Sequence, residues 1–138
     1  RHSLIHTLVK VLPEDMKLVL TGGDKERESL GKEFSSQVVL VQTSLQELAA
    51  LIDQSSGMVS LDTGAAHIAA HMRNPLVVLA SCVGVQWWNK DMYGEKIPTA
   101  LFTRLDVCAL GHDYSGYAKC LDMIDMDTVA KKVKEYFL

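Results

Sequence analysis

The end of one apolar run carries residues whose types and spacing could bind an anion. The run Ser60-Leu61-Asp62-Thr63-Gly64 passes from a predicted strand into a helix of small residues, and His67 follows about one turn inside it. Unpaired N–H groups and the helix dipole favour negative charge at a helix start, and Gly64 leaves room there for a bulky anion. The ring of His67 can point back toward that start and donate a hydrogen bond to a phosphate.

The acidic and hydroxyl residues of this run have other expected roles. Either Thr63 or Asp62 can cap the helix. Because like charges repel, Asp62 is expected to brace the turn or His67 rather than to touch a phosphate. An ordinary capped helix with a packed histidine explains the same residues equally well.

A second candidate binding segment is the run Thr21-Gly22-Gly23, which follows apolar residues 18–20. Two glycines let the backbone approach a ligand closely, and their N–H groups would lie at the start of the next helix. A plain tight turn between a strand and a helix is an equally good explanation.

Other patterns are weaker. His67 and His71 have a spacing that can hold zinc, but no third ligand is evident, so we expect no metal and a structural or solvent-facing His71. The pair Trp87-Trp88 could stack on a base or a sugar, or it could close the core under a long loop. The sequence contains no GxGxxG motif, no Walker lysine motif and no Ser-His-Asp order. We therefore expect no bound cofactor, and a dinucleotide dehydrogenase is disfavoured.

The elements that must position these residues alternate between strands and helices. The apolar runs predict strands over residues 17–21, 37–41, 57–61 and 76–80, with a short strand near 100–103. Helical periodicity covers residues 4–12, 24–34, 45–52, 65–72 and 127–138. Ser44 and Glu47 form a capping box, which places Leu45 on the apolar face of the helix that follows. Continuous apolar strands between helices predict an α/β fold, with a Rossmann-like parallel sheet and helices on both faces.

Composition sets the class of protein. The chain has 138 residues, 48% of them hydrophobic, which fits one globular domain over residues 1–138. The net charge of −3 and the lack of a basic cluster predict no nucleic-acid partner. No apolar run is long enough to cross a bilayer. The three cysteines, Cys82, Cys108 and Cys120, favour a reduced, cytoplasmic setting, although Cys108 and Cys120 could still pair.

Three segments together resemble the lipopolysaccharide heptosyltransferase family, glycosyltransferase family nine. They are the runs SLQELAALI, VSLDTGAAHIAA and NPLVVL, at residues 44–52, 59–70 and 74–79. The family carries a D-T-G-x-x-H-x-A-A signature after a strand and then a Pro-led strand, and Asp62, Thr63, Gly64 and His67 match that signature. Residues 18–26 and the tail from 120 are also similar, so the resemblance extends from about residue 16 to residue 138.

The resemblance implies the C-terminal half of a GT-B glycosyltransferase. In that family this half binds a nucleotide-sugar donor, here ADP-heptose, and the acceptor is the lipopolysaccharide inner core. It implies that Asp62, Thr63, Gly64 and His67 form the diphosphate and sugar end of the donor site, with Thr21, Gly22 and Gly23 near the nucleotide. The implied reaction is metal-independent and inverting. The catalytic base is expected in an N-terminal domain of the same protein, so the 138-residue chain is expected to be inactive alone. The implied location is the cytoplasm, at the inner membrane.

Two alternatives remain beside this reading. The chain could be a non-catalytic Rossmann-like module that binds a nucleotide or a protein partner, or a sugar-nucleotide epimerase of GT-B shape. The loop at residues 80–84 departs from the glycine- and threonine-rich loop of the family, so the sugar need not be heptose.

Overall fold

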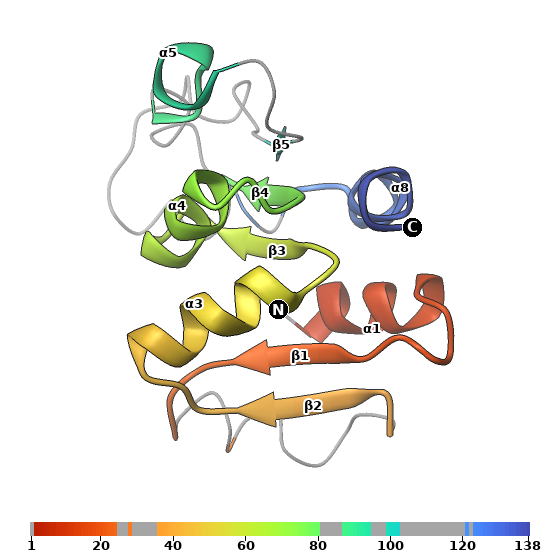
Figure 1. Cartoon of the computed structure of the whole chain (residues 1–138). Helices are drawn as coiled ribbons and strands as arrows, with labels where there is room; N and C mark the ends of the chain where they lie inside the picture. The colour runs from red at the N-terminus through yellow and green to blue at the C-terminus, as the bar shows by residue number, and fades with distance from the viewer. Residues whose placement is uncertain are drawn as a thin grey trace.

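The computed structural model describes residues 2–24, 28, 36–80, 87–94, 99–102, 121 and 123–138 (Figure 1). The strands are β1 (Leu18–Thr21), β2 (Val38–Val41), β3 (Met58–Leu61), β4 (Leu76–Leu79) and β5 (Thr99–Phe102). The helices are α1 (His2–Val11), α3 (Leu45–Gln54), α4 (Gly64–His71), α5 (Lys90–Tyr93) and α8 (Met126–Phe137). The helix expected over residues 24–34 lies mostly outside the described residues, and so do all three cysteines.

The strands form two parallel ladders. Strands β1 and β2 pair from Leu18 opposite Val38 to Thr21 opposite Val41. Strand β4 lies between β3 and β5 in a three-stranded sheet, and both of its pairings are parallel. The arrowheads of β1 and β3 point the same way in Figure 1, so the residues that follow these two strands lie on the same side of the molecule. The predicted α/β class with parallel strands is confirmed.

Helices cover both faces of β4, because its side chains alternate between two cores. Val77 and Leu79 belong to a cluster formed with α1 and α8, and Leu76 and Val78 belong to a cluster formed with α3 and α4. The first cluster contains Leu8, Ile124, Val129 and Val133, with Leu18, Val59 and Leu61 packed against it. The second contains Ile52, Ala66, Ala69, Ala70 and Ala80. The small residues of α4 therefore let that helix pack closely on the sheet.

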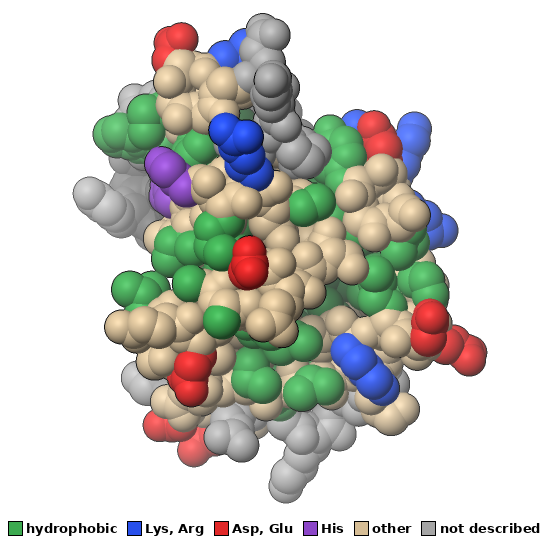
Figure 2. Space-filling model, in the orientation of Figure 1, with side chains coloured by type: hydrophobic (Ala, Val, Ile, Leu, Met, Phe, Trp, Pro, Cys, Tyr) green, Lys and Arg blue, Asp and Glu red, His purple; other side chains and the backbone are tan. Residues whose placement is uncertain are grey.

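Two expectations about burial are wrong. Strands β1 and β2 are not covered on both faces, because Val19 and Val39 are 37% and 40% exposed. Leu45 was expected on the apolar face of α3 but is 64% exposed; it is the first residue of the helix, whose buried residue is Ile52. Figure 2 shows positive and negative side chains interspersed on one face of the molecule. Among the described helices, none has the length and apolarity that a membrane crossing requires.

Local hydrogen bonds explain where the central helices begin and end. The predicted capping box is confirmed: the Ser44 hydroxyl accepts from the N–H of Glu47, and the Glu47 carboxylate accepts from the N–H of Ser44. At the end of α4, Arg73 has a positive φ of 59°, and Asn74 donates its N–H to the carbonyl of Ala69. This hydrogen bond and the positive φ form a Schellman motif, which ends α4 shortly before β4 begins.

Candidate functional site

The loop between β3 and α4 leaves the start of that helix without a side-chain cap. Thr63 occupies the N-cap position in an extended conformation, but its side chain makes no capping hydrogen bond. Its hydroxyl lies 3.3 Å from the hydroxyl of Ser60 instead. The first N–H groups of a helix have no partner within the helix, and the Thr63 side chain does not cap them here.

Space is open directly beside this helix start. A Cβ atom built on Gly64 would meet no other atom within 4 Å, and Gly64 is exposed. The geometry therefore leaves space beside Gly64 for at least a methyl group. Because α4 spans two turns, its dipole favours negative charge at this end.

Asp62, the first residue after β3, is held by an aromatic side chain from a distant segment. The indole N–H of Trp88 donates to Oδ1 of Asp62 at 3.0 Å. The same oxygen is 3.6 Å from Nε2 of His67, which is close enough for an ion pair but too long for a hydrogen bond. The Asp62 side chain is 17% exposed, so the indole contact offsets part of its desolvation.

His67 lies against two aromatic rings. Its Nδ1 forms a hydrogen bond with the hydroxyl of Tyr93. Its ring stacks on Trp88 with a centroid separation of 4.6 Å and an interplanar angle of 11°. The His67 side chain is still 35% exposed, so the contacts fix the ring without closing it off from solvent.

Tyr93 comes from the short helix α5, which the sequence analysis did not predict. Asn89 caps α5 by accepting from the N–H of Met92, and Gly94 ends it with a φ of 73°, a conformation that suits glycine. Burial, and secondarily the negative charge of Asp62, raises the pKa of the Tyr93 hydroxyl. The Asn89 and Gly94 pair was the available sequence signal for this helix.

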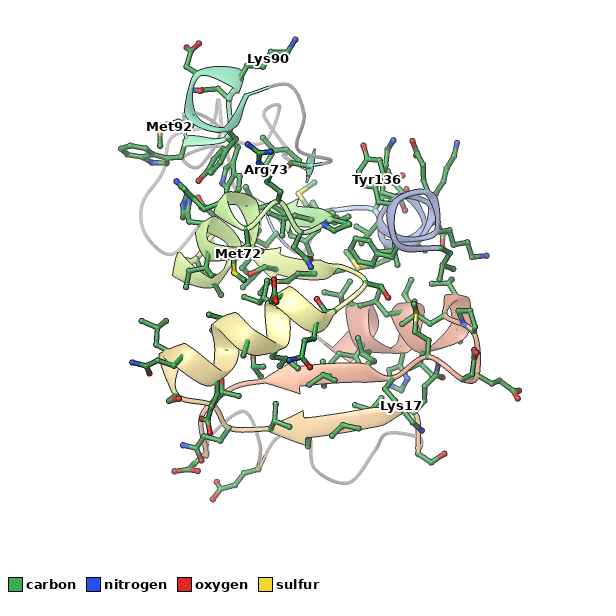
Figure 3. All side chains as sticks on the ribbon, in the orientation of Figure 1. Lys17, Met72, Arg73, Lys90, Met92 and Tyr136 are labelled. Carbon is green, nitrogen blue, oxygen red and sulfur yellow. The ribbon has the colours of Figure 1, made fainter. Side chains whose placement is uncertain are left out.

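A hollow adjoins these rings on the side of α5. Its volume is about 240 Å³, and it is lined by Trp88, Asn89, Lys90, Tyr93, Gly94, Thr99 and Leu101. The hydroxyl of Thr99 is buried and has no hydrogen-bond partner in the described part of the chain. Figure 3 shows α5, with its labelled residues Lys90 and Met92, above α4.

The structure therefore groups some of the predicted residues and leaves others apart. Asp62, Thr63, Gly64 and His67 lie together where β3 ends and α4 begins. The run Thr21-Gly22-Gly23 lies where β1 ends, in the other ladder, and Figure 1 places it on the same side of the molecule. Trp88 packs against the core and over His67, whereas Trp87 is exposed. His71 is exposed and meets Tyr93 edge-on.

No group of three His, Cys, Asp or Glu side chains that could hold a metal ion occurs in the residues that the structure describes. Among the described residues, groups that could interact with a ligand include the start of α4, the imidazole of His67 and the hollow beside α5.

Comparison with known proteins gives one family. The family model described as glycosyltransferase family 9 (heptosyltransferase) matches residues 7–80, which is more than half of the chain. The matched segment runs from α1 to the end of β4 and includes Asp62, Thr63, Gly64 and His67. Comparisons with curated proteins and with solved structures found no significant match.

Proposed function

The chain belongs to glycosyltransferase family 9, the heptosyltransferase family, and from this we propose that it is the donor-binding domain of an enzyme that transfers heptose from ADP-heptose. At the level of the family, the chain is a glycosyltransferase whose substrates are a nucleotide sugar and an acceptor. The proposed acceptor is a hydroxyl of the lipopolysaccharide inner core, on the cytoplasmic side of the inner membrane. The proposed fold is the Rossmann-like C-terminal half of a GT-B enzyme.

The proposed donor diphosphate lies at the start of α4. It would accept hydrogen bonds from the backbone N–H groups beyond Thr63 and from Nε2 of His67, with Gly64 leaving the space. Asp62 would hold the turn through Trp88 rather than contact the phosphates. Thr21, Gly22 and Gly23 would contribute from the end of β1, nearer the nucleotide.

The proposed reaction breaks the bond between C1 of the sugar and the β-phosphate oxygen. An acceptor hydroxyl attacks C1 from the opposite face, which inverts the configuration, and its proton passes to a base. The departing ADP gains negative charge, and the helix start together with the imidazole N–H would stabilise that charge without a metal ion. The proposed base belongs to a second, N-terminal domain of the same protein, as the family resemblance implies.

One observation carries this proposal: the signature residues form an uncapped, open helix start with a histidine one turn inside. The packing of the protein does not require a glycine at position 64, because a side chain there would meet no steric obstacle. A bulky anion bound at the helix start would require the space that glycine leaves.

Calorimetric titration with ADP tests the donor site. We expect the 138-residue chain to bind ADP, and His67→Ala to lower the affinity about tenfold, as expected for the loss of one hydrogen bond to a charged group. His71→Ala is the matched control, because His71 lies on the next turn of the same helix and is exposed; it should bind ADP as the original chain does.

The same experiment separates the proposal from a non-catalytic partner-binding module. Absence of ADP binding by the original chain at millimolar concentration would remove the donor-site proposal and favour that alternative. If ADP binds, an assay with ADP-heptose and a lipopolysaccharide core, with the chain alone and with an N-terminal acceptor domain supplied, tests the transfer reaction. We expect transfer only when both domains are present.

A further inference from the structure

Two side chains outside the signature surround His67 on its aromatic side. Trp88 and Tyr93 both follow β4 and lie 26 residues beyond their partners Asp62 and His67. The two rings stack on one another with centroids 5.3 Å apart, and each also stacks on His67. The hydrogen-bonding atoms of the signature are therefore contacted by side chains that the signature does not include.

The contact between Trp88 and Asp62 affects what His67 can do. Oδ1 of Asp62 lies 3.6 Å from Nε2 of His67. That oxygen already accepts from the indole N–H at 3.0 Å. The indole thus holds the carboxylate at a distance where Nε2 makes no full hydrogen bond to it, and an N–H at Nε2 remains able to donate elsewhere.

The contact with Tyr93 links the direction of one hydrogen bond to the tautomer of a neutral His67 ring. A neutral imidazole has one donor nitrogen and one acceptor nitrogen. If the Tyr93 hydroxyl donates to Nδ1, the proton must lie on Nε2, the nitrogen on the side of Asp62. Burial and the nearby Asp62 charge raise the pKa of Tyr93, which keeps its hydroxyl protonated and able to donate.

We propose that Tyr93 and Trp88 are positioning residues that hold His67 as an Nε2–H donor for the donor diphosphate. Tyr93 donates a hydrogen bond to Nδ1 and thereby selects the tautomer. Trp88 donates to the Asp62 carboxylate and holds it where it accepts no full hydrogen bond from Nε2. This inference rests on the proposed function for the identity of the ligand, but the tautomer of His67 in the free chain is independent of it.

Nitrogen-15 NMR of the imidazole tests the tautomer directly. At alkaline pH, where an ordinary histidine ring is neutral, we expect His67 in the original chain to show protonated Nε2 and unprotonated Nδ1. Tyr93→Phe keeps the ring stack and removes the hydroxyl, so a measurable Nδ1–H fraction should appear. Tyr136→Phe, on α8, is the matched control and should leave the His67 signals unchanged.

Binding of ADP tests the consequence. Tyr93→Phe and Trp88→Phe should each weaken ADP binding about three- to tenfold, the equivalent of one net hydrogen bond, while Tyr136→Phe binds as the original chain does. Thermal unfolding of each variant verifies that the fold is retained.

The outcomes are distinguishable. A protonated Nδ1 in the free original chain, or unchanged tautomer and affinity in Tyr93→Phe, would overturn the positioning role. If the tautomer responds to Tyr93→Phe but the original chain fails to bind ADP, the positioning of His67 stands and the proposed donor function does not.

Discussion

Gly64 allows ligand binding to be tested apart from folding, because its neighbourhood is open. We expect Gly64→Leu to lower ADP affinity at least about tenfold, since the new side chain would occupy the space assigned to the diphosphate. Its thermal midpoint should not fall, because leucine favours a helix over glycine by about 0.5–1 kcal/mol.

Gly64→Ala is the control for this substitution. It adds one methyl group where no protein atom lies within 4 Å, so ADP affinity should fall much less than in Gly64→Leu, and stability should rise slightly. Titration calorimetry and thermal unfolding provide both measurements. Unchanged ADP binding by Gly64→Leu would place the ligand somewhere other than this helix start.

At the scale of the elements, the capping box of α3 makes the free energy of unfolding depend on pH in the acidic range. Hydrogen bonds from the backbone N–H and the hydroxyl of Ser44 lower the pKa of Glu47 below its ordinary value. A carboxyl whose pKa is lower in the folded state contributes stability above its unfolded pKa, and that contribution is lost as pH falls through the folded value.

We therefore expect the free energy of unfolding to fall as pH drops below about 4. Glu47→Gln removes the charge but keeps an acceptor, so the loss of stability between pH 5 and pH 3 should be smaller in that variant. Urea unfolding at a series of pH values measures the slope. Glu135→Gln, at an exposed position of α8, serves for comparison. Equal slopes in Glu47→Gln and in the original chain would contradict the assignment.

Elements that depend on local sequence were the predictable ones. The capping box spans four residues, Ser44 to Glu47, so it could be predicted from neighbouring residues. Strand positions were predictable because buried β4 is apolar throughout.

The arrangement around His67 could not be predicted in the same way. Its partners lie 26 residues away, and no periodic pattern connects α5 to α4. The sequence left two roles open for the Trp87-Trp88 pair, and only the packed structure shows that Trp88 contacts Asp62 while Trp87 is exposed. The exposure of β1 and β2 was missed for a related reason: an apolar strand does not reveal whether a helix covers its second face.

For the whole molecule, β4 is the element on which both cores depend. Val77 of β4 is fully buried in the cluster that β4 forms with α1 and α8. We expect Val77→Ala to lower the free energy of unfolding by about 2 kcal/mol, because it leaves a cavity that rigid neighbours cannot fill. Val39→Ala, at an exposed position of β2, should cost less than about 1 kcal/mol. Chemical denaturation compares the two variants, and equal losses would mean that β4 is not the centre of the core.

The separation of the two ladders has a consequence for any ligand that contacts both. No backbone hydrogen bonds join β1 to β3 in the described sheets, whereas Leu18 of β1 packs against the same apolar cluster as Val59 and Leu61 of β3. The distance between the loop after β1 and the loop before α4 therefore depends on the packing of apolar side chains, and not on backbone hydrogen bonds between the two ladders. Substituting one apolar residue for another of different size at Leu18, Val59 or Leu61 would therefore change the distance between the two loops without altering the sequence of either loop.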